Sequence, residues 1–241
     1  MNRRRRALVA GSAAVVGVAM LAAPVAAAGY DSTTEALIRS LNRELLYIAV
    51  PITLLVEGIL TYTVVRFRNN DDPKPTTENR RLEISWTVAT AVILLFVGVA
   101  AFQVMANPAV TTSPRSAGDP PADALDVTVI GHQWFWEIRY PDSNVTLQSA
   151  STIYLPANRT IYFDVTSADV IHSMHVPGLA LKQDAIPGEH HTIRTRITST
   201  GEYQLYCAEF CGAGHSKMTA VIKVVPEDEY RQWVRKQKQK Q

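Results

Sequence analysis

The chain has 241 residues, of which 47% are hydrophobic, and its formal net charge at pH 7 is only +2. This length leaves room for one domain of ordinary size once the apolar segments are set aside. So small a net charge argues against a nucleic-acid partner, because such domains are usually strongly basic. Length and composition together favour a membrane-anchored module over a soluble enzyme.

Residues 1–28 have the three parts of a secretory signal peptide. Four arginines at positions 3–6 precede an Ala- and Val-rich run to Ala23, and three alanines at positions 26–28 stand before Gly29. We therefore predict a signal peptide cleaved after Ala28. An additional membrane helix is the alternative, but the run is short and dominated by Ala and Gly.

Residues 29–106 are predicted to form a two-helix transmembrane anchor. Two apolar spans, Leu46–Val65 and Ile84–Met105, are each close to the ~20 residues that cross the hydrocarbon core. The loop between them carries five basic residues: Arg66, Arg68, Lys74, Arg80 and Arg81. By the positive-inside rule this loop is cytoplasmic, so everything after Asn107 lies on the extracytoplasmic side of the cell (plasma) membrane.

Residues 107–124 contain Asn-Pro, Ser-Pro and Pro-Pro pairs and are predicted to be an extended linker. Short runs then alternate through residues 125–226 with the strand spacing of an all-β sandwich or barrel. These runs are Leu125–Ile130, Gln133–Tyr140, Val145–Gln148, Thr152–Leu155, Thr160–Val165, Thr192–Ile197, Glu202–Tyr206 and Met218–Val225. Residues 227–241 are predicted to be a polar C-terminal helix and basic tail that form a solvated cap.

The loop of residues 207–218 places two thiols, an imidazole and a thioether close together, from Cys207, Cys211, His215 and Met218. This set favours copper, because thiolate and thioether select Cu(I) and imidazole suits Cu(II). Zinc would have no use for Met218. The two cysteines are the only ones in the chain, so a small disulfide is the competing interpretation, but it leaves the histidine and the methionine without a role.

A single-copper site of the cupredoxin type needs one cysteine, so the second thiol indicates two copper ions bridged by both sulfurs. A further histidine is then required, and His172 and His175 are the candidates. Asp169-Val-Ile-His-Ser173, Lys182-Gln-Asp-Ala-Ile-Pro-Gly188 and the Cys-x-Glu-x-Cys-Gly-x-x-His-x-x-Met loop resemble subunit II of cytochrome c oxidase. The resemblance extends from the first membrane helix to about residue 225 and implies a cupredoxin-like domain with a binuclear CuA centre.

The resemblance also implies the roles of the ligands. Two thiolates would bridge the two copper ions, each imidazole would complete one of them, and a thioether and a main-chain carbonyl would be weak axial ligands. The bridging thiolates would be Cys207 and Cys211, and the imidazoles would be those of His172 and His215. The thioether would come from Met218 and the carbonyl from Glu209. Because both sulfurs bridge, the two copper ions can share one unpaired electron, and bond lengths change little on reduction.

The other histidines are interpreted as non-ligands. His175 is the rival of His172, but it lies three residues on, where strand alternation turns it to the opposite face. His190 and His191 are predicted on a solvated strand edge, and His132 in a polar turn.

In the family, the side chain at the position of Glu209 binds a magnesium ion shared with subunit I. A solvated carboxylate is the alternative. We favour magnesium, because an acid between two thiolate ligands raises the local negative charge unless a cation compensates it.

Gly131-His-Gln-Trp-Phe-Trp136 resembles the family's aromatic stretch. There the first tryptophan lies above CuA, beneath the surface where cytochrome c docks, so Trp134 is the predicted electron entry point. Trp136 is assigned to the core or the membrane interface, because aromatic side chains dominate core burial. The alternative is that all three aromatic residues are simply barrel side chains.

Two acids lie in or beside the membrane spans, where ionisable groups suggest function. Glu83 matches the family glutamate at the mouth of a proton channel into subunit I, and the alternative is a carboxylate that stabilises a helix start. Glu57 is predicted to pack against a partner helix. Two positions depart from the family pattern: Met174 replaces a frequent aromatic residue and Glu189 replaces a usual basic residue.

The predicted function is that of subunit II of a respiratory terminal oxidase. It would accept single electrons from an external cytochrome c or small copper protein and pass them to haem in subunit I, in a complex that also contains subunit III. The first alternative is the CuA-bearing subunit of a nitric oxide reductase. The second, a membrane-anchored copper-delivery protein, predicts a thioredoxin-like βαβ pattern with a distant histidine, whereas His215 follows the cysteines at once.

Overall fold

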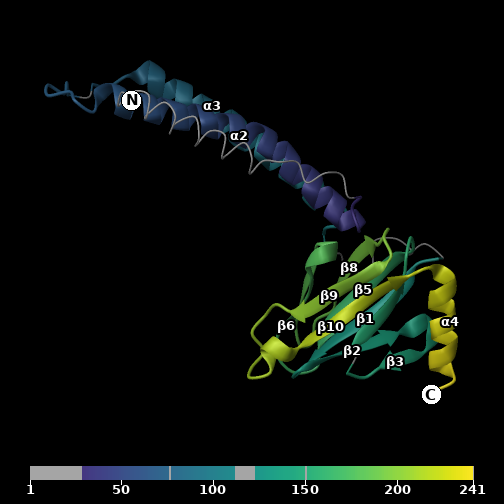
Figure 1. The fold of residues 1–241 in the computed structure, drawn as a ribbon. Helices are drawn as coiled ribbons and strands as arrows, with labels where there is room; N and C mark the ends of the chain where they lie inside the picture. Colours follow the sequence, from purple (N-terminus) through teal and green to yellow (C-terminus); the bar gives the residue numbers. More distant parts are fainter. Residues whose placement is uncertain (1–28, 76, 112–122, 150, 241) are drawn as a thin grey trace, which may run out of the picture.

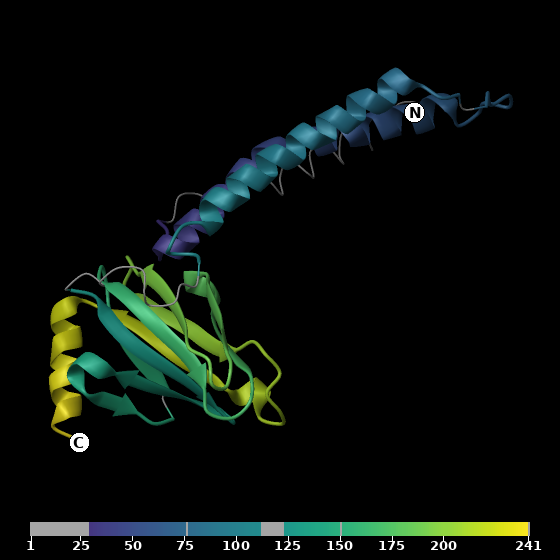
Figure 2. The same cartoon turned by 180° about the vertical axis from the view of Figure 1, so that it is seen from behind.

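The computed structural model describes residues 29–75, 77–111, 123–149 and 151–240. The predicted signal peptide, residues 1–28, and most of the predicted linker, residues 112–122, lie outside the described residues. In the described part, a long helical hairpin runs away from a β-sandwich that carries the C-terminal helix on one side (Figures 1 and 2). The predicted fold class, two apolar helices followed by an all-β domain, is confirmed.

The hairpin consists of α2 (Thr33–Phe67) and α3 (Arg80–Met105). Each helix begins at a polar cap: the Ser32 side chain accepts from the Glu35 amide and the Asn79 side chain from the Leu82 amide. Both helices are long and apolar enough to cross a membrane. Helix α2 begins well before the predicted span, because its polar first turns form part of the contact with the sandwich.

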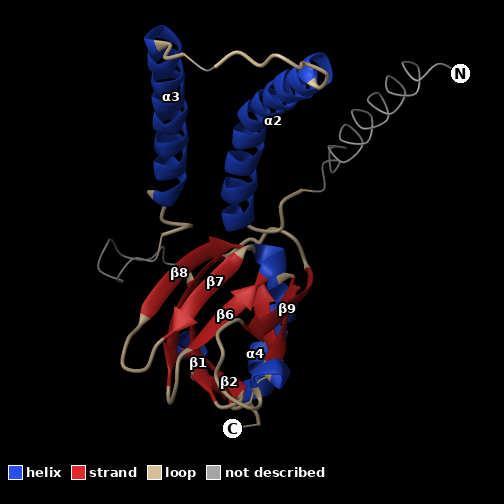
Figure 3. Ribbon diagram, turned by 90° about the vertical axis from the view of Figure 1, so that its left-hand side faces the viewer, coloured by secondary structure: helices blue, strands red, loops and turns tan. Residues whose placement is uncertain are grey.

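The start of α2 is attached to the sandwich by buried polar contacts. Ser32 Oγ donates to the Leu179 carbonyl at 2.7 Å, and Thr34 Oγ1 lies 3.1 Å from Thr195 Oγ1. Thr34 Oγ1 also donates to the carbonyl of Ala109, just after α3, at 2.9 Å. Both ends of the hairpin therefore lie at the β domain, while the basic connection between the helices lies at the far end (Figure 3).

The β domain contains two five-stranded sheets, in the orders β3-β2-β1-β5-β8 and β4-β10-β9-β6-β7. Most neighbours are antiparallel, but β1 pairs parallel with β5 and β4 parallel with β10. The strands are β1 (Leu125–His132), β2 (Phe135–Tyr140), β3 (Val145–Leu147), β4 (Thr152–Pro156), β5 (Thr160–Ser167), β6 (His172–Val176), β7 (Leu181–Ala185), β8 (His191–Arg196), β9 (Gly201–Cys207) and β10 (Thr219–Val225).

The core lies between the two sheets and follows from alternation along the strands. In β1, for example, Leu125, Val127 and Val129 are buried, and in β5 Ile161, Phe163 and Val165 are buried. Two strands, β6 and β7, are absent from the predicted set of runs. The predicted run Gln133–Tyr140 is also too long, because Gln133 and Trp134 form the turn between β1 and β2.

The C-terminal helix α4 (Glu227–Lys238) is present, but its interpretation as a solvated cap is wrong for one face. Tyr230 is buried, and the Trp233 ring lies 5.2 Å from the Tyr140 ring and stacks on Tyr154 at 5.0 Å. Positions 230, 233 and 234 share one helical face. That apolar face covers the side of the sandwich, and Glu227 in the first turn of α4 also approaches Arg159 of the β domain at 3.7 Å.

Candidate metal centre

The predicted ligands meet where β6, β9 and the loop between β9 and β10 come together. His172 is the first residue of β6 and Cys207 the last of β9, and these strands pair with Met174 opposite Cys207. The loop continues through Cys211 into the short helix η3 (His215–Lys217) and then into Met218. Strand pairing thus places the first two side chains, and the compact loop brings in the others.

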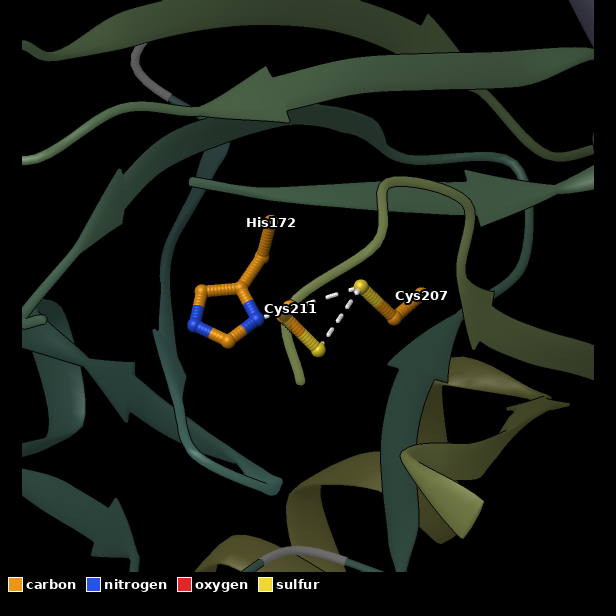
Figure 4. A group of neighbouring side chains, drawn as sticks. All are labelled: His172, Cys207 and Cys211. Carbon is orange, nitrogen blue, oxygen red and sulfur yellow. Dashed lines mark hydrogen bonds between the residues drawn. The ribbon is translucent and has the colours of Figure 1, made fainter. Parts of the chain in front are cut away.

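The ligand atoms of these residues converge. Cys207 Sγ lies 3.8 Å from Cys211 Sγ and 3.8 Å from His172 Nδ1. Cys211 Sγ lies 3.6 Å from His215 Nδ1 and 3.8 Å from Met218 Sδ. Figure 4 shows His172 and the two cysteines pointing toward one another. Within the described ranges, these three residues form the one group of at least three possible His, Cys, Asp or Glu ligands, with their ligand atoms within 4.8 Å of one another.

Both cysteines are free thiols, and their 3.8 Å separation is far longer than the ~2.05 Å of a disulfide bond. The competing disulfide interpretation therefore does not describe this site. Burial, followed by the neighbouring Cys207, raises the pKa of Cys211 to about 11. Two adjacent buried thiolates need a compensating cation, so the donor set fits a thiophilic metal ion bound between them.

His172 is completely buried, and its ring orientation is set by Asp169. The His172 Nε2–H donates to Asp169 Oδ1 at 2.8 Å, which leaves the Nδ1 lone pair toward the sulfurs; this tautomer is assigned from the hydrogen-bond partners. Gly131 lies against the same ring, and a Cβ at that position would come within 2.7 Å of His172 Cδ2. Glycine at 131 therefore leaves room for the imidazole.

His175 lies on the opposite face of β6. Its ring packs edge-on against Tyr206 with centroids 4.9 Å apart, and it is partly exposed. Burial, and then the charge of Lys182, lowers the pKa of His175. The alternation of β6 thus separates the two candidate histidines, with only His172 facing the thiols.

The two predicted axial ligands occupy different environments. The carbonyl oxygen of Glu209 lies 3.1 Å from Cys207 Sγ, whereas the Glu209 side chain is exposed. Met218 is completely buried, with its sulfur on the Cys211 side of the cluster. The main-chain oxygen and the thioether therefore lie beside different thiols.

Trp134 and its neighbour Gln133 contact the loop between β9 and β10. The Trp134 Nε1–H and the Gln133 side-chain amide both donate to the Cys211 carbonyl, at 3.2 and 2.7 Å. The Trp134 ring lies against the loop, so closely that a Cβ at Gly214 would come within 2.4 Å of its Cδ2. Trp134 is nevertheless 42% exposed, so it connects the protein surface to the main chain of a predicted ligand.

Trp136 has the opposite environment, since it is completely buried and its ring lies edge-on to His172 at 6.1 Å. Its Nε1–H is buried without a hydrogen-bond partner among the described residues. The assignment of Trp136 to the core is confirmed.

The remaining histidines pair with carboxylates away from the cluster. His132 is the last residue of β1 rather than part of a polar turn, and its ring stacks on Phe135. His190 lies just before β8 and is exposed, and His191 is the first residue of β8. His132 pairs with Glu137, His190 with Asp164, and His191 with Glu189.

The acids predicted in the membrane spans are remote from this cluster. Glu83 lies in the first turn of α3, and Glu57 lies midway along α2. The start of α3 is at the end of the hairpin far from the sandwich (Figure 1). Both glutamate side chains are exposed. Two residues depart from the family pattern. Met174 is completely buried opposite Cys207, and the Glu189 carboxylate lies 3.0 Å from His191 Nε2.

Two residues of the site, Gln133 and Asp169, were not predicted from sequence. Both stand inside the segments that resemble the family, and the only signals in the sequence are that Gln133 precedes Trp134 and that Asp169 lies three residues before His172. Position along the chain does not reveal the contact between them: the main-chain N–H of Gln133 donates to Asp169 Oδ2 at 2.7 Å across 36 residues of sequence.

The fold and the site together define a β-sandwich on a hydrophobic helical hairpin, with a buried cluster of thiol, imidazole and thioether ligands. Residues 143–225 match the family described as cytochrome c oxidase subunit II, periplasmic domain, and residues 26–104 match its transmembrane domain. The chain belongs to the cytochrome c oxidase subunit II family and is a membrane protein. It is thus a component of an oxidoreductase complex.

Individual relatives agree with this assignment. The probable cytochrome c oxidase subunit 2 of Rickettsia bellii is 34% identical, over 79% of this chain and 75% of that protein. Cytochrome c oxidase subunit 2 of Cereibacter sphaeroides is 31% identical, over 79% and 72%. The chain spans 64% of the length of several other rickettsial relatives. Among solved structures, the periplasmic domain of subunit II of cytochrome oxidase from Bradyrhizobium japonicum is 33% identical, over 50% of this chain and 97% of that chain, with a TM-score of 0.47.

Proposed function

We propose that this chain is the electron-entry subunit of a respiratory terminal oxidase. It accepts electrons one at a time from an external cytochrome c or small copper protein and passes them to haem in subunit I, where oxygen is reduced to water. The observation that carries this proposal is the convergence of two thiols, two imidazole Nδ1 atoms and a thioether beneath a half-exposed tryptophan.

The arrangement of the ligands supports a binuclear rather than a mononuclear copper site. His172 lies beside Cys207 and His215 beside Cys211, so each thiol has its own imidazole. The two sulfurs are adjacent and can bridge, while Met218 and the Glu209 carbonyl lie near opposite sulfurs. When bound, the copper pair would supply a one-electron carrier whose ligands combine the soft and imidazole donors that copper prefers.

The residues themselves favour fast transfer by holding their positions. Four of the side chains, those of His172, Cys207, Cys211 and Met218, are buried. Two of them lie at the ends of paired strands, and rigid elements hold a site more precisely than loops do. Burial also excludes water, whose reorientation would otherwise accompany each change of charge.

The exposed carboxylate of Glu209 is the proposed magnesium ligand. Its main-chain oxygen is directed to Cys207 while its side chain is exposed on the outside of the loop. That position suits a cation shared with subunit I, because oxygen ligands are what magnesium prefers. Phe210, the next residue, is 78% exposed, which is consistent with a partner subunit covering this side of the loop.

The topology of the hairpin supports the proposed location. Both hairpin ends lie at the β domain, and the five basic residues lie toward the far end (Figure 3). By the positive-inside rule the β domain is extracytoplasmic, on a plasma membrane, with residues 1–28 acting as the signal peptide. Glu83 would then lie at the cytoplasmic end of α3, where we propose that it serves proton uptake into subunit I. Lipid-facing and partner-facing sides of α2 and α3 would contact the membrane and subunits I and III.

Purification of the complex through a tag on this chain tests the proposal. The preparation should contain haem, consume oxygen when supplied with reduced cytochrome c or a reduced small copper protein, and lose that activity with cyanide. Reduction of nitric oxide without oxygen uptake would instead identify a nitric oxide reductase. A chain that copurifies without haem and donates copper to an apo-oxidase would indicate copper delivery.

A further inference from the structure

Asp169 makes a set of contacts that the ligand roles alone do not require. It lies in the turn between β5 and β6, with its side chain 32% exposed. Its Oδ1 accepts from His172 Nε2 at 2.8 Å and from the Val170 amide at 2.6 Å. Its Oδ2 accepts from the main-chain N–H of Gln133 at 2.7 Å. One carboxylate therefore joins a predicted copper ligand to the turn between β1 and β2.

The contact with His172 determines which ring nitrogen is available. Because Nε2 donates its hydrogen to a carboxylate, the lone pair is on Nδ1, which lies 3.8 Å from Cys207 Sγ. A partner of this kind fixes both the tautomer and the ring orientation of a metal-binding histidine, and it makes the imidazole a stronger donor. The ring is otherwise held by steric contacts, including the close approach of Gly131.

The contact with Gln133 extends the same arrangement to the predicted electron entry point. Gln133 precedes Trp134, and both side chains donate to the Cys211 carbonyl. Asp169 fixes the main chain of this turn on one side, and the Cys211 carbonyl fixes its side chains on the other. The turn is thus held between Asp169, which contacts His172, and the main chain of Cys211.

We propose that Asp169 is a positioning residue, which holds the His172 ring with Nδ1 toward the thiols and fixes the turn that presents Trp134. The inference rests on the proposed function in that copper is the ion to be bound. It differs from a role in attracting the electron donor, since its effect acts on the copper ligands and is present without any donor.

The test compares three variants of the full chain in detergent. Asp169→Ala removes both acceptor oxygens, Asp169→Asn keeps one acceptor but removes the charge, and Asp184→Ala is the matched control. Asp184 is a partly exposed carboxylate on β7 that accepts from Ser173, the residue after His172, but does not touch the imidazole. Thermal unfolding of each copper-free variant shows that the chain is folded.

We expect Asp169→Ala to lower the affinity for copper, measured by competition with a chelator, by about 10- to 100-fold, the usual cost of losing such a partner. Asp169→Asn should lose less, and Asp184→Ala should match the wild type. Nitrogen NMR of the reduced, copper-free chain above pH 8 should find His172 protonated on Nε2 in the wild type and in Asp169→Asn. In Asp169→Ala the two tautomers should be mixed.

Unchanged copper affinity and an unchanged tautomer in Asp169→Ala would overturn the proposal. So would a variant whose only defect is a higher KM for the electron donor, which is the behaviour of a docking charge. If the wild type binds no copper, the proposed function fails, yet the tautomer measurement still decides whether Asp169 orients His172.

Discussion

Replacement of Trp134 by alanine in the intact complex is expected to slow electron entry from the external donor by orders of magnitude. Copper content and spectrum should stay unchanged, because no ligand atom is removed. The Cys211 carbonyl loses the indole donor but keeps the Gln133 amide at 2.7 Å. Since Trp134 is 42% exposed, its truncation leaves a surface depression rather than a core cavity.

Trp136→Ala is the comparison that separates electron entry from structural integrity. Trp136 is completely buried beside His172, and truncation of a core tryptophan costs about 3 to 5 kcal/mol. Folded protein and copper should therefore be lost together with activity. Copper content, thermal unfolding and donor oxidation are measured on one preparation of each variant. Unchanged donor oxidation in Trp134→Ala would remove this residue from the pathway.

The second large effect is expected at the histidines of β6. His172→Ala should abolish the mixed-valence electron paramagnetic resonance signal, because it removes the only β6 imidazole that faces the thiols. His175→Ala should leave the signal largely intact, since this ring packs against Tyr206 on the opposite face. Both variants change the same residue type within one strand, so each is the control for the other. Loss of the signal in His175→Ala with retention in His172→Ala would refute the ligand assignment.

The ligand loop was predictable from sequence because its chemistry is local. Cys207, Cys211, His215 and Met218 lie within one short stretch, and loop closure alone keeps them near one another. Alternation in the same way predicted most strands of the sandwich and the separation of His172 from His175. These features depend on spacing along the chain, which a sequence displays directly.

The contacts that were missed depend on pairing between distant segments. Strand β6 begins at a predicted ligand and β7 contains Lys182, Gln183 and Asp184, so neither shows a simple apolar alternation. The attachment of Ser32 to Leu179 spans 147 residues. Likewise, the contact of Asp169 with Gln133 exists only after β1 and β5 have paired. No local pattern distinguishes such residues from ordinary turn and cap residues.

The central claim, a binuclear copper centre, is tested most directly by counting copper in the purified full chain after loading under reducing conditions and careful reoxidation. Two thiols that bridge, each with its own imidazole, predict two copper ions per chain, a purple colour and a mixed-valence resonance signal. One copper ion per chain with an intense blue absorption band would show a mononuclear site and contradict the account.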